Sequence, residues 1–269
     1  MAIDFEYYAT PPSLTRYLAT WLKDHGWPIQ GRCFEPCAGD GAIIEAIGRD
    51  GCEWESNDFD PRWRDLHMSL DAADPQSWGH LHPMDWCVSN VPFSLATPII
   101  ANALATARVG VAMYLRLSWH EPLKTGPRRT FLLEHPPTAI LYLPRVAHQR
   151  SRKTGQWATD SVTSCWTIWI KDRANSGTMW VDTSRVDPCI VDMLIKGERM
   201  PIIPMMGDGS KAFGYIGQRG QYIDYTPPAV IQALQDEEPS HRARMDEING
   251  LTGAEGERRA AWIERWMDQ

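Results

Sequence analysis

The sequence predicts an α/β fold with a mostly parallel sheet and helices on both faces. Apolar segments rich in β-branched and aromatic residues alternate along the chain with segments of helical periodicity. Glycine-rich or acidic turns follow several of the apolar segments. Strands that alternate with helices form parallel sheets, and such sheets bind ligands at the carboxyl ends of their strands.

The first elements of the chain have clear boundaries. Residues 10–26 predict a helix with Thr10 as its N-cap, proline in its first turn and Gly26 at its end. Residues 32–51 predict a strand, a glycine-rich loop and a helix that begins near Ala42. These segments set up one strand–loop–helix unit.

The later elements repeat the alternation. We expect further strands in residues 52–61, 84–93, 109–119, 138–144 and 161–171, and further helices in residues 95–108 and 226–235. The segment 161–171 alternates in a way typical of a strand near the sheet edge, and we interpret its tryptophans, Trp166 and Trp169, as core residues.

The pattern weakens after residue 173, which divides the chain into a domain of residues 1–173 and a C-terminal region of residues 174–269. Trp262 and Trp266 lie four residues apart in the tail, which predicts a helix with an apolar stripe. This stripe packs on its own domain or on a partner subunit.

Composition excludes several classes of protein. The chain has 269 residues, 43% of them hydrophobic and 23% charged, as in a folded globular protein. No apolar run approaches the roughly 20 residues of a membrane span and no secretory signal is visible, so we expect a cytoplasmic protein without a membrane partner. Six cysteines form no CxxC pair, so we expect small buried side chains in a reducing compartment and no metal site.

Charge is unevenly distributed. The chain carries −7 in total, whereas residues 116–173 carry +6. One basic face on an acidic protein and a scatter of solvated charges both fit this asymmetry. Within that segment a basic loop contains Arg145, Arg150, Arg152 and Lys153, and we expect it to contact nucleic-acid phosphates.

Acidic residues follow two predicted strands. Glu35 precedes a loop in which Gly39 and Gly41 permit a tight turn, and no P-loop lysine follows. An acidic loop repels phosphate, so a cationic ligand fits better than a dinucleotide. Asp58 follows the second strand, where an acid can accept from both ribose hydroxyls, with Phe59 against an adenine ring. We interpret Asp60 as a helix cap.

The segment Val88–Ser94, VSNVPFS, sets an amide beside an aromatic ring at a strand end. Asn90 and Phe93 together suggest a site that binds a flat polar group. The alternative is an ordinary Asn-x-Pro turn with Phe93 in the core.

The motifs resemble those of the S-adenosylmethionine-dependent DNA adenine-N6 methyltransferases of γ motif order, of the orphan or phage type. The resemblance covers about residues 5–170 and rests on a Thr-Pro helix start, an EPxAGxG loop, an acid after the second strand and an NPPF-like strand end. It implies a Rossmann-like methyltransferase sheet with a small C-terminal recognition or packing region. It also implies DNA methylation by base flipping of the target adenine.

The resemblance assigns roles to the motif residues. The implied catalytic residues are Asn90, Val91, Pro92 and Phe93. The implied cofactor-binding residues are Thr10, Pro11, Glu35, Pro36, Cys37, Ala38, Gly39, Asp40, Gly41, Asp58, Phe59 and Asp71, with Asp74 as the alternative to Asp71. Asn90 and the Val91 carbonyl would accept from the target amine while Phe93 stacks on the base.

One departure keeps alternatives open. Val91 stands where the family has proline, so the carbonyl is kept but the rigidity is lost. The alternatives are an RNA or protein-glutamine methyltransferase and a catalytically degenerate cofactor- or DNA-binding module. The basic loop favours duplex DNA as the partner, and a homodimer on a palindromic site is compatible with the short C-terminal region.

Overall fold

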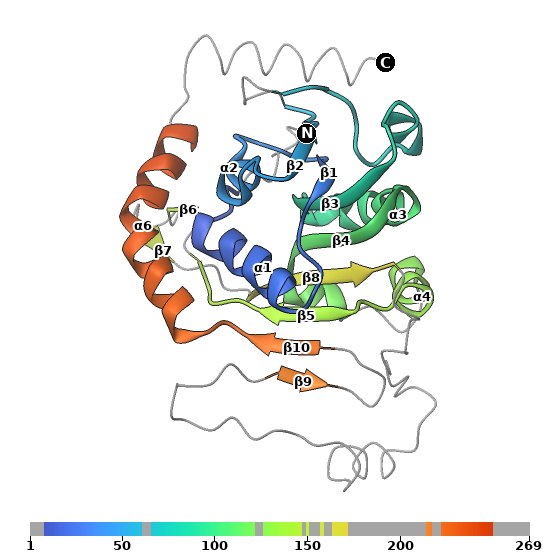
Figure 1. Ribbon diagram of the computed structural model, residues 1–269. Helices are drawn as coiled ribbons and strands as arrows, with labels where there is room; N and C mark the ends of the chain where they lie inside the picture. The colour runs from blue at the N-terminus through green and yellow to red at the C-terminus, as the bar shows by residue number, and fades with distance from the viewer. Residues whose placement is uncertain are drawn as a thin grey trace, which may run out of the picture.

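One eight-stranded sheet organises the chain (Figure 1). The computed structural model describes residues 8–60, 66–121, 126–146, 149–150, 157–158, 163–171, 214–216 and 222–249. The strands in sheet order are β2 (Cys52–Ser56), β1 (Gly31–Glu35), β3 (Met84–Asn90), β4 (Ala107–Arg116), β8 (Ser164–Ile170), β5 (Ala139–Tyr142), β10 (Tyr222–Tyr225) and β9 (Gly214–Ile216). A separate pair consists of β6 (Gln149–Arg150) and β7 (Trp157–Ala158).

The sheet is mostly parallel, as the sequence predicts. β1 pairs in parallel with both β2 and β3, and β3 pairs in parallel with β4. Only β8 and β9 run antiparallel to their neighbours among the described strands of this sheet. The carboxyl ends of β1, β2 and β3 therefore meet at one edge of the sheet.

The position of β8 corrects one expectation. This strand lies between β4 and β5 and is buried along its whole length, so the prediction of a strand near the edge is wrong. Its Thr167 is hydrogen-bonded inside the core, to buried His120 at 2.8 Å. The prediction that Trp166 and Trp169 are core residues is confirmed, since they are 0% and 4% exposed.

Helices cover both faces of the sheet. The helices are α1 (Pro12–Asp24), α2 (Ala42–Ile47), α3 (Ala96–Thr106), α4 (Pro127–Glu134) and α6 (Pro228–Asn249), with single turns η1 (Pro75–Trp78), η2 (Phe93–Leu95) and η3 (Leu117–His120). Residues of α1 and α2 share one apolar cluster with Trp86 and Val88. Residues of α3 share the other with Cys87, because successive residues of β3 point to opposite faces.

The start of α1 differs from the prediction. Pro11 stands at the N-cap position and no side chain caps the helix. The Thr10 hydroxyl instead accepts a hydrogen bond from Asn90, 80 residues away. The predicted end is close to the observed one: α1 stops at Asp24, and Gly26 follows with a φ of 84°.

The described C-terminal elements continue the same structure. β10 pairs in parallel with β5, and α6 packs along α1 at the left of Figure 1. No helix within the described ranges is long and apolar enough to cross a membrane. A role of residues 174–269 in target recognition or dimerisation stays a prediction, and the tail helix with Trp262 and Trp266 lies outside the described residues.

Candidate functional site

A cavity of about 300 Å³ lies at the carboxyl ends of β1, β2 and β3. The predicted site residues that line it are Thr10, Glu35, Pro36, Cys37, Ala38, Gly39, Asp40, Asp58, Phe59, Asp71, Asn90, Val91 and Pro92. Pro11, Gly41 and Phe93 are not among its lining residues. Segments that are distant in sequence therefore form one site, as expected for the strand ends of a parallel sheet.

The glycine-rich loop turns from β1 into α2 below this cavity. Gly39 and Gly41 have φ values of 57° and 82°, a conformation that residues with a Cβ rarely adopt. The Gly41 amide donates to the Ala38 carbonyl at 2.8 Å, and α2 begins at Ala42 as predicted. The two glycines thus let the backbone pass close to whatever the cavity binds.

Asp58 is held in a fixed orientation. One carboxylate oxygen accepts from the Gly39 amide at 2.6 Å, and the other accepts from the Asp60 amide at 2.8 Å. Each carboxylate oxygen can accept a further hydrogen bond, so Asp58 can still receive ligand hydroxyls. The bond from Gly39 also connects the turn after β2 to the glycine-rich loop.

Asn57 is a structural residue that sequence reasoning missed. Its buried amide donates to the carbonyls of Pro36 and Leu70, both at 2.9 Å, and accepts from the Leu70 amide at 2.8 Å. One side chain therefore connects the ends of β1 and β2 to the segment around Leu70. Its position in the sequence could have indicated this role, since Asn57 directly precedes Asp58, the predicted ribose-binding acid.

Glu35 is the most unusual group in the site. Its side chain is 1% exposed, and no described residue provides a hydrogen bond to Oε2. Burial raises the pKa of this carboxyl well above its ordinary value, and the negative charges of Asp58 and Asp40 add to the increase. A hydrogen bond from the Ile44 backbone acts in the opposite direction. When it is ionised, a carboxylate buried in this way needs a cationic or hydrogen-bond-donating partner.

Asn90 ends β3 at the mouth of the cavity. Its Nδ2 donates to the Tyr8 carbonyl at 2.7 Å and to the Thr10 hydroxyl at 3.0 Å. The Tyr8 carbonyl fixes which end of the amide carries nitrogen, because a carbonyl can only accept and an amide oxygen cannot donate. Oδ1 is therefore held on the other side of the amide, where it can accept from a ligand.

Phe93 lies beside the cavity rather than in its wall. Its ring stacks with Tyr8 at 6.2 Å between centroids, and the Arg116 guanidinium lies over it at 4.7 Å. The ring also packs against the core cluster around α1. A base that stacks on Phe93 must therefore share or replace one of these contacts.

The two candidates for an adenine contact are separated by position. Asp71 lines the cavity, and its Oδ1 accepts from the Ala73 amide at 2.8 Å. Asp74 caps η1 by accepting from the Gln76 amide at 2.9 Å, and it does not line the cavity. Asp71 is therefore the better placed of the two.

The basic loop is described only in part. Arg145 is exposed beside α6, and the backbone of Arg150 belongs to β6. Arg152 and Lys153 lie outside the described residues. A phosphate-binding role for this loop stays a prediction.

Four of the five described cysteines fit the interpretation as buried apolar residues, whereas Cys37 is half-buried and lines the cavity. Cys33, Cys52, Cys87 and Cys165 are buried, and burial raises the pKa of the Cys33 and Cys87 thiols, which keeps them protonated. Within the described ranges no group of three or more His, Cys, Asp or Glu side chains is placed to hold a metal ion.

The fold of this chain is similar to those of several solved structures, although the sequence identities are low. No protein-family model matches the chain, and no curated protein matches its sequence. A type I restriction-modification methyltransferase subunit from Streptococcus thermophilus matches 88% of this chain and 53% of its own, with 14% identity and a TM-score of 0.48.

Two further solved structures are similar. A proposed class I S-adenosylmethionine-dependent methyltransferase from Listeria monocytogenes matches 73% of this chain and 72% of its own, with 11% identity and a TM-score of 0.46. A proposed RNA methyltransferase from Pyrococcus horikoshii matches 62% of this chain and 88% of its own, with 16% identity and a TM-score of 0.44. Similarities of this size concern the fold alone.

Proposed function

We propose that this protein is an S-adenosylmethionine-dependent methyltransferase that methylates the N6 amine of a flipped-out adenine in duplex DNA. The observation that carries the proposal is the orientation of Asn90, whose anchored Nδ2 directs Oδ1 away from Tyr8 and Thr10. The acidic cavity beside it supports the choice of cofactor.

The cavity fits the cofactor by the chemistry of its walls. S-adenosylmethionine supplies a methyl group on a positively charged sulfur, together with an ammonium group, two ribose hydroxyls and an adenine. The buried Oε2 of Glu35 lacks a described hydrogen-bond donor, and an ammonium group would provide one. Asp58 is oriented for the ribose, and Asp71 is placed for the adenine amine.

Asn90 would act on the substrate amine. The lone pair of an adenine N6 amine is delocalised into the ring, so the amine is a poor nucleophile. Asn90 Oδ1 and the Val91 carbonyl would each accept one of its N–H groups, which favours a pyramidal nitrogen with a localised lone pair. The nitrogen would then form its bond to the methyl carbon as the carbon–sulfur bond breaks with its electron pair left on sulfur, and one N–H proton would leave to solvent.

Duplex DNA is the substrate class that the basic loop and the resemblance favour. The target adenine lies inside the stack of a duplex and must leave it to reach Asn90. The positive charge of residues 116–173 would supply phosphate contacts in a protein whose net charge is −7. RNA and protein glutamine carry comparable amine or amide groups, so the assay tests both as alternative substrates.

A second candidate is a binding module that no longer transfers methyl. The observation that favours it is the half-buried ring of Phe93, which already contacts Tyr8 and Arg116. Such a protein would bind the cofactor and DNA without turnover. Activity is therefore the property that separates the two functions.

The decisive experiment uses radiolabelled S-adenosylmethionine with duplex DNA, total RNA or protein extract, followed by identification of the methylated product. N6-methyladenine in DNA supports the proposal. Label in RNA or in glutamine reassigns the substrate, and binding of the cofactor without any labelled product identifies the binding module.

Asn90→Ala then tests the site itself. The variant should lose nearly all turnover because Asn90 acts on the amine most strongly at the transition state. Its affinity for S-adenosylhomocysteine, measured by calorimetry, should stay at the parent value. Methylation at the parent rate would mean that this strand end is only a turn.

A further inference from the structure

The C-terminal helix α6 reaches the glycine-rich loop of the cofactor site. The guanidinium of Arg244 forms an ion pair with the Asp40 carboxylate, across 204 residues of sequence. Its Nη2 also lies 3.4 Å from the Asp40 carbonyl and 3.6 Å from a carboxylate oxygen of Glu45 on α2. Both ionic side chains of the pair are partly buried, Arg244 at 31% exposed and Asp40 at 19% exposed.

The position of Asp40 gives this ion pair a consequence for the cavity. Asp40 lines the cavity together with Glu35 and Asp58, so three carboxylates face one another across a small volume. Negative charges at short range repel one another, and a cation beside one of them reduces that repulsion. Arg244 is such a cation, and it approaches from outside the cavity.

We propose that Arg244 is a positioning residue of the cofactor site, which neutralises Asp40 and holds the glycine-rich loop so that ligand binding depends on helix α6. The inference rests on the proposed function for the identity of the ligand, and it extends the site to a part of the chain that the motifs do not include. Arg244 contacts the loop and not the cavity, so its effect passes through Asp40.

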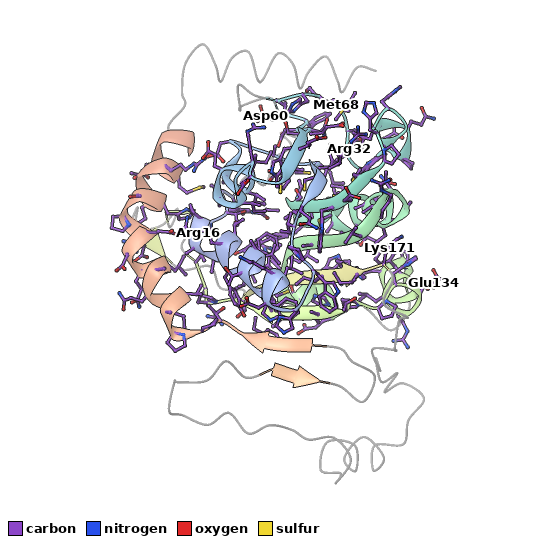
Figure 2. The ribbon with its side chains drawn as sticks, viewed as in Figure 1. Arg16, Arg32, Asp60, Met68, Glu134 and Lys171 are labelled. Carbon is purple, nitrogen blue, oxygen red and sulfur yellow. The ribbon has the colours of Figure 1, made fainter. Side chains whose placement is uncertain are left out.

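Helix α6 is also held on α1 by a second ion pair, which provides an internal comparison. Arg16 of α1 pairs with Glu237, and the Ser13 amide donates to Glu237 at 2.9 Å. Figure 2 shows Arg16 on the side of α1 that faces α6. This pair secures the helix but lies away from the cavity lining, so it separates docking of α6 from the charge on Asp40.

The proposal predicts a change in the pH dependence of ligand binding. An ammonium ligand needs an ionised Glu35, so affinity should rise as pH rises through the elevated pKa of that carboxyl. The negative charge of Asp40 contributes to this elevation, and Arg244 opposes it by pairing with Asp40. Removal of Arg244 should therefore move the rise in affinity to higher pH, and removal of the Asp40 charge should move it to lower pH.

Other ionisable groups lie near the pair and the cavity. They are Cys37, Asp58, Asp60, Asp71 and Cys87 around the cavity, Glu45 on α2, and Glu237, Glu238 and His241 on α6. Burial raises the pKa of the Cys37 and Cys87 thiols and lowers the pKa of His241, so these three groups are neutral near pH 7. Glu35 therefore remains the group whose ionisation we expect to follow.

The experiment measures S-adenosylhomocysteine binding by calorimetry between pH 6 and pH 9. Arg244→Met should weaken binding at pH 7 by about 5- to 150-fold, the usual range of coupling between two sites, and the loss should shrink at high pH. Arg244→Lys keeps the charge and should bind much as the parent does. Arg242→Met is the matched control, because it removes the same charge from α6 and its ion pair is with Glu238 of the same helix.

The double variant Asp40→Asn with Arg244→Met tests the route of the effect. In the Asp40→Asn background, loss of Arg244 should produce no further change in the pH profile. An equal change in both backgrounds would overturn the proposal, as would an unchanged profile in Arg244→Met. A uniform loss in both Arg16→Met and Arg244→Met, without a shift in pH, would also overturn it by reducing Arg244 to a docking contact.

A wrong assignment of the ligand can be distinguished from a wrong role for Arg244. If the parent protein does not bind S-adenosylhomocysteine, amide hydrogen exchange of the ligand-free protein tests Arg244. Arg244→Met should then speed exchange at the Gly39 and Gly41 amides, while Arg242→Met should not. Unchanged exchange at both amides would overturn the positioning role.

Discussion

Replacement of Glu35 by glutamine should have opposite effects on ligand binding and on stability. Glutamine keeps the shape of the side chain but cannot ionise. Affinity for S-adenosylhomocysteine should fall because the ammonium group loses a charged acceptor. The free energy of unfolding without ligand should be equal or higher near pH 8, because folding no longer has to protonate this carboxyl or bury it as an anion.

The size of the binding loss follows from the single contact involved. Oε2 lacks a described hydrogen-bond donor, so the ammonium group would supply one charge-assisted bond to it. Such a bond contributes about 1.5–3 kcal/mol, which corresponds to affinity weaker by about 10- to 150-fold. 5′-Methylthioadenosine, which lacks the amino-acid part, should bind parent and variant alike.

The stability effect has a defined sign and pH range. The pKa of Glu35 is higher in the folded than in the unfolded chain, so its protonated form stabilises the fold. That contribution is complete below the unfolded value and is lost as pH rises through the folded value. The variant should therefore gain stability relative to the parent across that interval.

Calorimetric titration with both ligands and urea denaturation at several pH values would measure these effects. Glu53→Gln is the control, since Glu53 is 82% exposed on β2 and its replacement should change neither property. Equal loss of affinity for both ligands would refute an ammonium contact at Glu35. A variant less stable than the parent at pH 8 would refute the idea that burial of this carboxyl lowers the stability of the fold at that pH.

Two further predictions concern Thr10 and Asp58. Thr10→Val removes one of the two acceptors of the Asn90 amide, so the transition state should be destabilised by roughly one hydrogen bond, about 0.5–1.5 kcal/mol. Thr10→Ser keeps the hydroxyl and should restore turnover, as measured by single-turnover methylation. A loss confined to S-adenosylhomocysteine affinity would make Thr10 a cofactor contact instead. Asp58→Ala should weaken 5′-methylthioadenosine and S-adenosylhomocysteine together, by about 1.5–3 kcal/mol per ribose bond at most. Calorimetry checks it, and unchanged affinity for both ligands would move the ribose contact to Asp60.

Local features of the sequence determined the strand–loop–helix units and the edge of the sheet where the site forms. The positive φ values of Gly39 and Gly41 follow from a turn that only glycine adopts easily. Glu35, Asp58 and Asn90 stand at or just after the ends of three neighbouring strands, and parallel strands bring such residues together. Short-range chemistry was sufficient for these inferences.

The tertiary structure decided which distant groups complete the site. The contacts of Asn90 with Tyr8 and Thr10, and the pair of Arg244 with Asp40, join residues 80 to 204 positions apart. No local pattern encodes them, because they depend on how α1 and α6 pack on the sheet. Hydrophobic periodicity likewise could not predict the central position of β8, since strand order is set by long-range pairing and by the area each face buries.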